Sequence, residues 1–350
     1  MPIDFQVIRI FILTFLSFAF AILWTPLLTH YLYKYKLGKQ IRTSDAAPIM
    51  SGLHQKKSGT PTMGGVLIWV TVLIFIAVFY YLGVWFDGVF ATLNFFNRAQ
   101  TLLPLGALIA AALVGLFDDF LNVRRIGPKG GGLSVRYRLI VYAVIATVAA
   151  LWFYFRLDWD LLRLPFIGNF NIGLWFIPLV IFIIVGTAFS VNEIDGLDGL
   201  AGGTLVTAFL AYGAIAFVQG RYDLTAFCAV IVGSLLAFLW FNISPARFFM
   251  GDTGAMSLGV TLAIIAIYTN AILLLPVIGL MFVIESLSVI IQVLSKKIRK
   301  KKIFLSTPIH HHFEAKGWPE CKVVMRFWMI SAMMAVIGLV IFLVDRGAWK

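Results

Sequence analysis

Ten long apolar runs, separated by short polar segments, are the feature of this sequence that most constrains its fold. A helix needs about 20 mostly apolar residues to cross a bilayer core about 30 Å thick, and about 17 can suffice. The pattern therefore predicts an all-α integral membrane protein, a bundle of ten transmembrane helices forming a single domain over residues 1–350. The runs cover residues 11–33, 64–86, 101–117, 139–155, 174–190, 200–218, 224–240, 255–269, 271–294 and 327–344.

Composition excludes an ordinary soluble domain, since 61% of the residues are hydrophobic and 13% are charged. The longest apolar stretch, residues 255–294, would form a helix of roughly 60 Å at about 1.5 Å per residue, twice the thickness of the bilayer core. The stretch must therefore fold back. The polar sequence Tyr268-Thr269-Asn270 predicts a tight hairpin between the eighth and ninth spans.

The basic residues indicate how the spans are oriented. If the N-terminus lies outside, the inside segments contain 21 of the 28 Lys and Arg residues. Such an inside excess is typical of membrane proteins, so both termini are predicted to lie on the outer, periplasmic side. The net charge of +12 then reflects topology, and we expect no nucleic-acid partner. The inside segments are residues 34–63, 118–138, 191–199, 241–254 and 295–326.

This topology places the polar motifs on one side of the membrane, with only scattered charges on the other. Asp118 and Asp119 end the third apolar run, where the helix dipole disfavours carboxylates. Side chains at adjacent helical positions diverge by about 100°, so the two acids are expected to have separate jobs instead of sharing a proton. A Mg²⁺ ion or a substrate phosphate is the expected neighbour, and a solvated helix end is the alternative.

A glycine-rich acidic segment follows the fifth run. Asn192, Asp195 and Asp198 lie three residues apart, so they would share one face if the segment were helical. Its glycines, Gly196 among them, would let a ligand approach the backbone. The alternative is that Asp198 simply caps the helix after it.

A similar segment precedes the eighth run. Asp252 lies at the start of a helix whose free N–H groups would favour an anion. Arg247 would add positive charge for a phosphate, and Phe248 or Phe249 could stack on a base. Here too, capping of the helix by Asp252 is the simpler alternative.

Three further features carry polar chemistry. The consecutive His310, His311 and His312 do not have the spacing of a zinc site, so contacts to phosphate or sugar hydroxyls are expected. Residues 54–65 are basic and then glycine-rich but do not form a P-loop; Lys57 could neutralise a diphosphate there. Inside the ninth span lies an acid, Glu285, on one face with Ser288 and Gln292. Because burying a carboxylate in a membrane is costly, this acid is either functional or hydrogen-bonded between helices.

These residues make the sequence resemble the phospho-N-acetylmuramoyl-pentapeptide transferases (MraY type), within the polyprenyl-phosphate N-acetylhexosamine-1-phosphate transferase superfamily. The resemblance covers nearly the whole chain. Its first and last segments separate the muramoyl-pentapeptide branch from relatives that use N-acetylglucosamine. The segments are HQKKSGTPTMGG at 54–65, FDD at 117–119, NEIDGLDGLAGG at 192–203, FMGDTG at 249–254 and TPIHHHFEAKGWPE at 307–320.

The resemblance implies ten helices in the bacterial plasma (inner) membrane and an active site on the cytoplasmic face. It implies transfer of phospho-MurNAc-pentapeptide from UDP-MurNAc-pentapeptide to undecaprenyl phosphate, with Mg²⁺ required and with lipid I and UMP as products. The implied catalytic residues are Asp118, Asp119, Asp252 and His311, with Mg²⁺ on Asp252. The implied substrate-binding residues are Lys57, Asn192, Asp195, Gly196, Asp198, Asn242, Phe249, Gln292, His310 and His312.

Two positions depart from the family pattern. Asn122 stands where the family usually has a lysine, so Arg124, Arg125 or Lys129 is expected to supply that charge. The pair Glu193-Ile194 replaces the usual Leu-Thr.

Several alternatives stay open at this level. One-step in-line attack by the lipid phosphate, oriented or deprotonated by Asp118, is expected; a phospho-aspartyl intermediate on Asp252 is the other route. A superfamily enzyme that transfers GlcNAc-1-phosphate, a transporter of lipid-linked substrates and a scaffold for cell-wall enzymes are the competing functions. The apolar outer surface allows a homodimer without requiring one.

Overall fold

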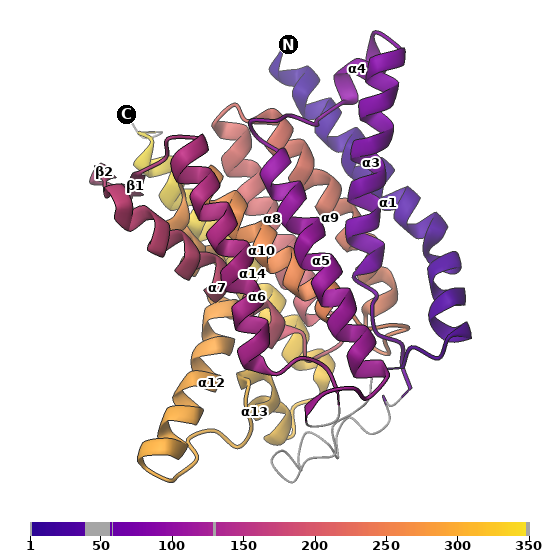
Figure 1. Cartoon of the computed structure of the whole chain (residues 1–350), viewed down its shortest axis with the longest axis vertical. Coiled ribbons are helices and arrows are strands. Elements are labelled where there is room, and N and C mark those ends of the chain that lie inside the picture. Colours follow the sequence, from indigo (N-terminus) through magenta and orange to yellow (C-terminus); the bar gives the residue numbers. More distant parts are fainter. Residues whose placement is uncertain (1, 39–56, 58, 129–130, 348–350) are drawn as a thin grey trace.

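The computed structural model describes residues 2–38, 57, 59–128 and 131–347, and these residues form a bundle of long helices (Figure 1). Within them, nine helices are long and apolar enough to cross a membrane, and a bent pair supplies a tenth span. The predicted all-α membrane bundle is confirmed, and its ten spans are matched if the bent pair counts as one span. They correspond to α1 (Ile3–Lys34), α3 (Val66–Trp85), α5 (Leu102–Val123), α6 (Val135–Leu151), α7 (Phe176–Ile194), α8 (Leu200–Val218), α9 (Tyr222–Asn242), α10 (Gly251–Tyr268), α12 (Leu280–Ile298) with the short helix before it, and α14 (Glu320–Asp345).

Short elements connect the spans. A β-hairpin, which the sequence analysis did not predict, pairs β1 and β2 in antiparallel register with Leu161 opposite Asn171. Arg163 ties it to the end of α14 through an ion pair of 2.6 Å with Asp345. The connecting elements are α4 (Val89–Leu93), a π-helical turn (Trp152–Arg156), β1 (Leu161–Leu164), β2 (Gly168–Asn171), two 3₁₀ turns (Gly173–Trp175 and Ile272–Leu274), α11 (Leu275–Ile278) and α13 (Ile309–Ala315).

The predicted hairpin after the eighth span is confirmed, because α10 ends at Tyr268 and Asn270 adopts a left-handed φ of 47°. The ninth span, in contrast, is not one straight helix. Its two parts, Ile272–Ile278 and Leu280–Ile298, meet at 81°. As a result the C-terminal part of α12 projects out of the bundle at the lower left of Figure 1, with α13 to its right.

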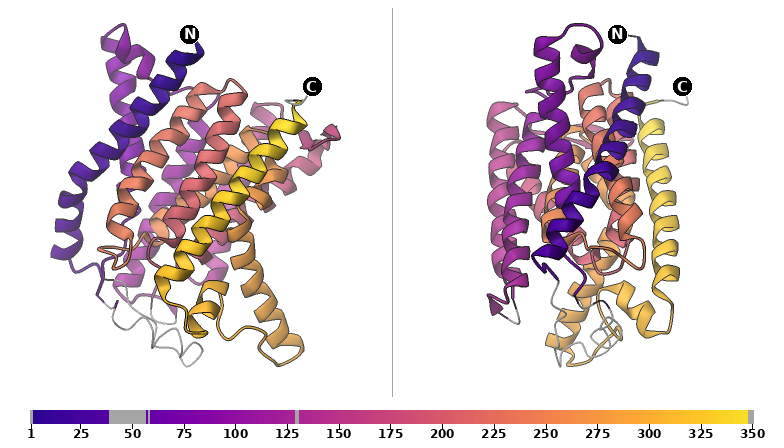
Figure 2. Two further views of the ribbon diagram at one scale, coloured as in Figure 1. Left: turned by 180° about the vertical axis from the view of Figure 1, so that it is seen from behind. Right: turned by 90° about the vertical axis from the view of Figure 1, so that its right-hand side faces the viewer.

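The core is centred on α10, which is buried along almost its whole length and packs against α5 and α7. Two of its hydroxyl groups donate within the helix, Ser257 to the Thr253 carbonyl at 2.6 Å and Thr261 to the Ser257 carbonyl at 2.7 Å. The Thr253 hydroxyl instead donates to the Ala112 carbonyl of α5 at 2.8 Å. Both chain termini lie at one end of the bundle, and α13 lies at the other (Figure 2). An even number of crossings requires this arrangement.

Candidate active site

The polar motifs gather at the end of the bundle opposite the two termini (Figure 2). Here the last turns of α5 and α7 meet the first turns of α6 and α10. The helix α5 continues six residues past its apolar run, so Asp118 and Asp119 lie inside its final turns and do not end it. The predicted end at residue 117 was therefore wrong. Both carboxylates are buried, with exposures of 0% and 4%, because neighbouring helices supply partners for them.

A glycine brings α5 against the start of α10. A Cβ atom added to Gly115 would lie 2.4 Å from the carbonyl oxygen of Asp252. This distance is too short for a non-bonded contact, so no residue with a side chain fits at this position without a shift of the backbone. This close approach places Asp118 and Asp119, one turn later on α5, beside the first turn of α10. The glycine of the sequence Gly-Leu-Phe-Asp-Asp thus determines where the two acids lie.

The basic, glycine-rich motif near residue 60 packs onto the same helix start. The backbone N–H groups of Gly64 and Gly65 donate to the carbonyls of Phe249 and Met250, each at 2.8 Å. A Cβ atom on Gly65 would lie 2.3 Å from the Cα atom of Gly254. Two motifs separated by about 185 positions in the sequence therefore form one backbone-paired unit.

Asp119 holds the N-terminus of α10 from outside that helix. Its carboxylate accepts the backbone N–H groups of Asp252 at 3.1 Å and Thr253 at 3.0 Å, and the hydroxyl of Thr62 at 3.2 Å. A carboxylate at the positive end of a helix dipole is stabilised. The simpler hypothesis that Asp252 caps α10 is wrong, since Asp252 lies within the first turn and Asp119 bonds to the free N–H groups.

Arg138 lies between the remaining two acids. Its Nε is 2.7 Å from Asp118 Oδ2 and its Nη2 is 2.9 Å from Asp252 Oδ2, both as ion pairs. Its Nη1 donates to Asn192 Oδ1 at 3.0 Å, while the Asn192 amide donates to Asp252 Oδ1 at 2.6 Å. The other oxygen of Asp118 accepts the backbone N–H of Leu133. One guanidinium thus joins α5, α6, α7 and α10, and the two adjacent acids do have separate partners.

The sequence analysis did not identify Arg138 as the cation of this site. Of the expected candidates, Arg124 instead lies over the Phe120 ring at 5.3 Å, and Lys129 is outside the described residues. The only available signal was that Arg138 is the last residue of a predicted inside segment, directly before the apolar run 139–155; in the structure α6 begins earlier, at Val135. That signal could not show which acid the side chain faces.

A second polar group surrounds Lys57. Its Nζ contacts Asp198 Oδ1 at 2.7 Å and Glu320 Oε1 at 2.5 Å, and Glu320 also accepts the backbone N–H of Asp198. The second Asp198 oxygen accepts the N–H of Ala246 at 3.1 Å. The hypothesis that Asp198 caps α8 is therefore wrong: its oxygens bond elsewhere, and the cap residue is Gly199. The motif residues His54–Lys56 and Ser58 lie outside the described residues.

Two predicted substrate-binding amides are used to hold loops. Asn242 accepts the N–H of Gly199 at 2.9 Å and donates to the Phe248 carbonyl at 2.8 Å, which joins the two glycine-rich segments. Gln292 accepts the N–H groups of Ile303 and Phe304 and donates to the Phe304 carbonyl at 2.8 Å.

The three histidines have different surroundings, as their adjacency required. Buried His310 is 3.0 Å from Glu285 through its Nδ1, and its Nε2 faces Gly196, where an added Cβ would lie only 2.2 Å away. His311 contacts Glu314 at 2.7 Å. The intramembrane acid Glu285 is therefore hydrogen-bonded between α12 and α13, the alternative left open for it.

His312 faces the 303–305 loop, where its Nδ1 accepts the Leu305 N–H at 3.1 Å. Partial burial, and then the nearby Lys316 ammonium, lower the pKa of His312 from its ordinary value. A lowered pKa keeps the ring neutral at pH 7, which its role as an acceptor requires.

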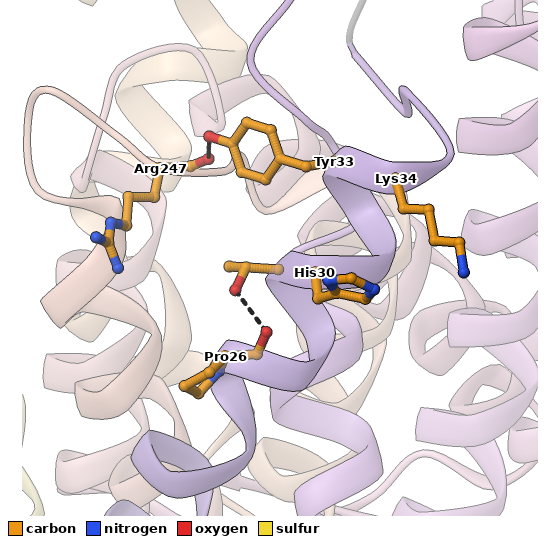
Figure 3. A pocket seen from close by; sticks show the side chains of 6 residues that line it. Pro26, His30, Tyr33, Lys34 and Arg247 are labelled. Atoms are coloured by element: carbon orange, nitrogen blue, oxygen red, sulfur yellow. Dashed lines mark hydrogen bonds between the residues drawn. The ribbon is translucent and has the colours of Figure 1, made fainter.

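The segment before α10 differs from expectation at two residues. Phe248 is fully buried in the core and cannot stack on a base, whereas Phe249 is half-buried and stays at the site. Arg247 lines a different cavity, of about 500 Å³, against α1 with Pro26, Thr29, His30, Tyr33 and Lys34 (Figure 3). There the Tyr33 hydroxyl donates to the Arg247 carbonyl at 2.9 Å.

The opposite end of the bundle also gathers polar groups, contrary to the expectation of scattered charges. Buried Arg9 pairs with Asp223 at 2.8 Å and donates to the Asn94 carbonyl, and Asn97 donates to the same Asp223. These residues come from three separate segments of the chain. Their proximity could not be seen in a linear pattern.

The family model of Glycosyl transferase family 4 matches residues 101–270, and signature 1 of the phospho-N-acetylmuramoyl-pentapeptide-transferases matches residues 57–68. A protein of that name from Chloroflexus aggregans is 41% identical over 90% of this chain and 84% of its own length. Those from Geobacillus sp. (strain WCH70) and Bacillus subtilis (strain 168) are 40% and 39% identical, each over 93% of this chain and 95% of their own lengths.

Proposed function

The chain belongs to the phospho-N-acetylmuramoyl-pentapeptide transferases, and from that premise we propose how its own residues carry the reaction. The enzyme transfers phospho-MurNAc-pentapeptide from UDP-MurNAc-pentapeptide to undecaprenyl phosphate, which yields lipid I and UMP. It is a multi-pass membrane protein. The observation that carries the proposal below is the cluster in which Asp118, Arg138, Asn192 and Asp252 meet at one end of the bundle.

This cluster matches the electrostatic problem of the reaction. Two anions, a lipid phosphate and a nucleotide diphosphate, must come together, and phosphoryl transfer depends on positioning and on neutralising charge. Arg138 and Lys57 provide positive charge. Asp118 orients the lipid phosphate or accepts its proton, and Asp119 acts indirectly by fixing the first turn of α10, on which Asp252 lies.

The donors at this end fit Mg²⁺, which takes oxygen ligands and is usually held by one or two carboxylates together with substrate phosphates. Asp252 would hold it, with Asp118 and the amide oxygen of Asn192 close by. Among the residues that the structure describes, no three His, Cys, Asp or Glu side chains are grouped to bind a metal alone. That finding agrees with a site completed by the diphosphate. Bound there, Mg²⁺ would neutralise the diphosphate and stabilise the departing UMP.

The remaining predicted residues would surround the nucleotide. Asn192, Asp195, Gly196 and Phe249 would form its binding surface with His311 and His312. Asp198, Asn242, Gln292 and His310 would shape that surface, since their polar atoms bond to loops and helices around it.

The site is proposed to face the cytoplasm, where UDP-linked precursors are found. The positive-inside distribution supports this orientation, since the end that carries the site also carries most of the Lys and Arg residues. The enzyme would then lie in the bacterial inner membrane, with both termini in the periplasm.

The direct test is release of UMP by the purified protein with undecaprenyl phosphate and either UDP-MurNAc-pentapeptide or UDP-GlcNAc, with and without Mg²⁺. We expect turnover only with the muramoyl-pentapeptide nucleotide and only with the metal. Turnover with UDP-GlcNAc alone would instead support a GlcNAc-1-phosphate transferase. The one-step route further predicts inversion of configuration at the transferred phosphorus, and net retention would contradict it.

A further inference from the structure

Arg138 contacts the carboxylate oxygens of Asp252 to which a divalent cation would bind. Its three guanidinium nitrogens each contact a different group: Nε is beside Asp118 Oδ2, Nη2 is beside Asp252 Oδ2, and Nη1 is beside Asn192 Oδ1. Nη1 also approaches Asp252 Oδ1, at 3.3 Å. Both carboxylate oxygens of Asp252 therefore face the guanidinium, and a cation could not bind them without moving it.

Arg138 cannot give way by losing its proton, because a guanidinium stays charged in proteins. A second cation at Asp252 would meet a positive charge in direct contact with the same oxygens. The two must therefore exclude each other, since like charges a few ångströms apart repel strongly away from bulk water. The guanidinium has to swing away from Asp252 for a metal to bind there.

The contacts and position of the Arg138 side chain suit a counter-ion that can move away from Asp118 and Asp252. The Arg138 Nε and Asp118 Oδ2 atoms lie 2.7 Å apart, yet neither has an aligned hydrogen-bond partner, so charge alone holds this contact. The Arg138 side chain is 16% exposed, whereas Asp118 is fully buried. Arg138 also lies in the first turn of α6, just after the loop containing Gly131 and Gly132, which have φ values of 127° and 81°.

We propose that Arg138 is an exchangeable counter-ion: it holds the Asp118–Asp252 pair together before substrate binds, and a divalent cation at Asp252 displaces it toward the diphosphate. The proposal rests on the metal role of Asp252 given above. Displacement would supply one positive charge to the incoming nucleotide and free Asp118 Oδ2 at the same moment. The acceptor for the lipid phosphate would thus become available only once the site is loaded.

The test is the affinity for Mn²⁺, used as a spectroscopic substitute for Mg²⁺, in the full-length protein in detergent without nucleotide. Electron paramagnetic resonance of free Mn²⁺ gives the Kd. We expect the Kd of Arg138→Gln for Mn²⁺ to be lower than that of the wild type by a factor of about ten or more, because the competing charge is gone. Arg136→Gln is the matched control, an exposed arginine two positions away, and should leave the Kd unchanged.

The outcomes separate the two claims. An unchanged or higher Kd in Arg138→Gln overturns the exchange, because Arg138 then does not compete with the metal. Asp252→Asn should remove the site; if the wild type and Asp252→Asn bind Mn²⁺ alike, the metal role of Asp252 fails, and the exchange fails with it.

A second measurement does not depend on the folding of Arg138→Gln. In the wild-type protein, the ¹⁵Nε resonance of Arg138 should shift when Mg²⁺ is added, and the same addition to Asp252→Asn should leave it in place. A resonance unmoved by saturating Mg²⁺ in the wild type would contradict displacement.

Discussion

At the scale of single residues, the site depends on polar groups that are buried in pairs. Asp118 pairs with Arg138, and Glu285 pairs with His310, with both members of the second pair fully buried. Removing one partner of such a pair is costly because the other stays buried and unsatisfied, unless another cation takes its place as proposed for Arg138. Each pair also joins different helices, so its geometry is part of the architecture.

The Glu285–His310 pair gives a residue-scale prediction. Glu285→Ala should destabilise the protein by about 1–3 kcal/mol, the usual cost of leaving a buried polar group without its hydrogen-bond partner. Glu285→Gln should lose less, because its amide oxygen can still accept from His310 Nδ1. Ser288→Ala, on the same helix, removes a hydroxyl that bonds only within α12 and serves as the control. Free energies of unfolding in a denaturant titration provide the comparison, and equal stability of Glu285→Ala and wild type would contradict it.

The roles of single residues were the part of the site that the sequence predicted least completely. The acids, amides and histidines of the site could be singled out because polar groups are conspicuous among apolar runs. Arg138 could not, since it is one of many basic residues near the predicted inside ends of the helices, and only the packing of α6 shows which acids it meets. The roles of Asn242 and Gln292 in holding loops likewise depend on backbone groups that a side-chain pattern does not reveal.

At the scale of elements, close crossings position the catalytic groups. Gly115 on α5 lies against the backbone of α10, and Gly65 lies against Gly254. Helices in membranes associate through small residues of this kind, which let their backbones approach. The length of the apolar runs predicted that these helices exist, but it could not predict which glycines mark their crossings or that the ninth span bends by 81°.

Two glycines of α5 provide the element-scale prediction. In Gly115→Ala the added methyl group would overlap the Asp252 carbonyl, which should separate α5 from α10 and lower turnover about tenfold or more, one factor of ten being 1.36 kcal/mol in the barrier. A Cβ atom on Gly106 meets nothing within 4 Å. Gly106→Ala should therefore keep full activity and gain up to about 1 kcal/mol in helix stability. Turnover rates and thermal unfolding of both variants check this, and a fully active Gly115→Ala would refute the crossing argument.

At the scale of the whole molecule, ten crossings put both termini at one end and the site at the other (Figure 2). This arrangement was predictable, because span length and the positions of basic residues are properties of the linear sequence. The Arg9–Asp223 cluster was not, since its contacts join segments far apart in the chain, and the sequence analysis did not predict the β-hairpin. The single-domain organisation and the homodimer stay predictions.

Orientation can be tested with a natural cysteine. Cys321 is exposed at the end that carries the site, and Cys228 is buried. In intact cells a membrane-impermeant maleimide should leave Cys321 unmodified, and it should react once the membrane is permeabilised. The control is Phe166→Cys in a Cys321→Ser background, at the exposed tip of the β-hairpin, which should react without permeabilisation. The reverse pattern would mean that the site faces the periplasm.

The central claim is that the acids around Arg138 carry the transfer of phospho-MurNAc-pentapeptide. The measurement that tests it most directly is UMP release by Asp118→Asn and Asp252→Asn, which keep size and polarity but remove one charge each. Each should lose about 100-fold or more in turnover, ~2.7 kcal/mol in the barrier, while Asp87→Asn, at an exposed position on the opposite side, stays at the wild-type rate. Turnover within a few-fold of wild type in either site variant, with the fold intact, would contradict the account.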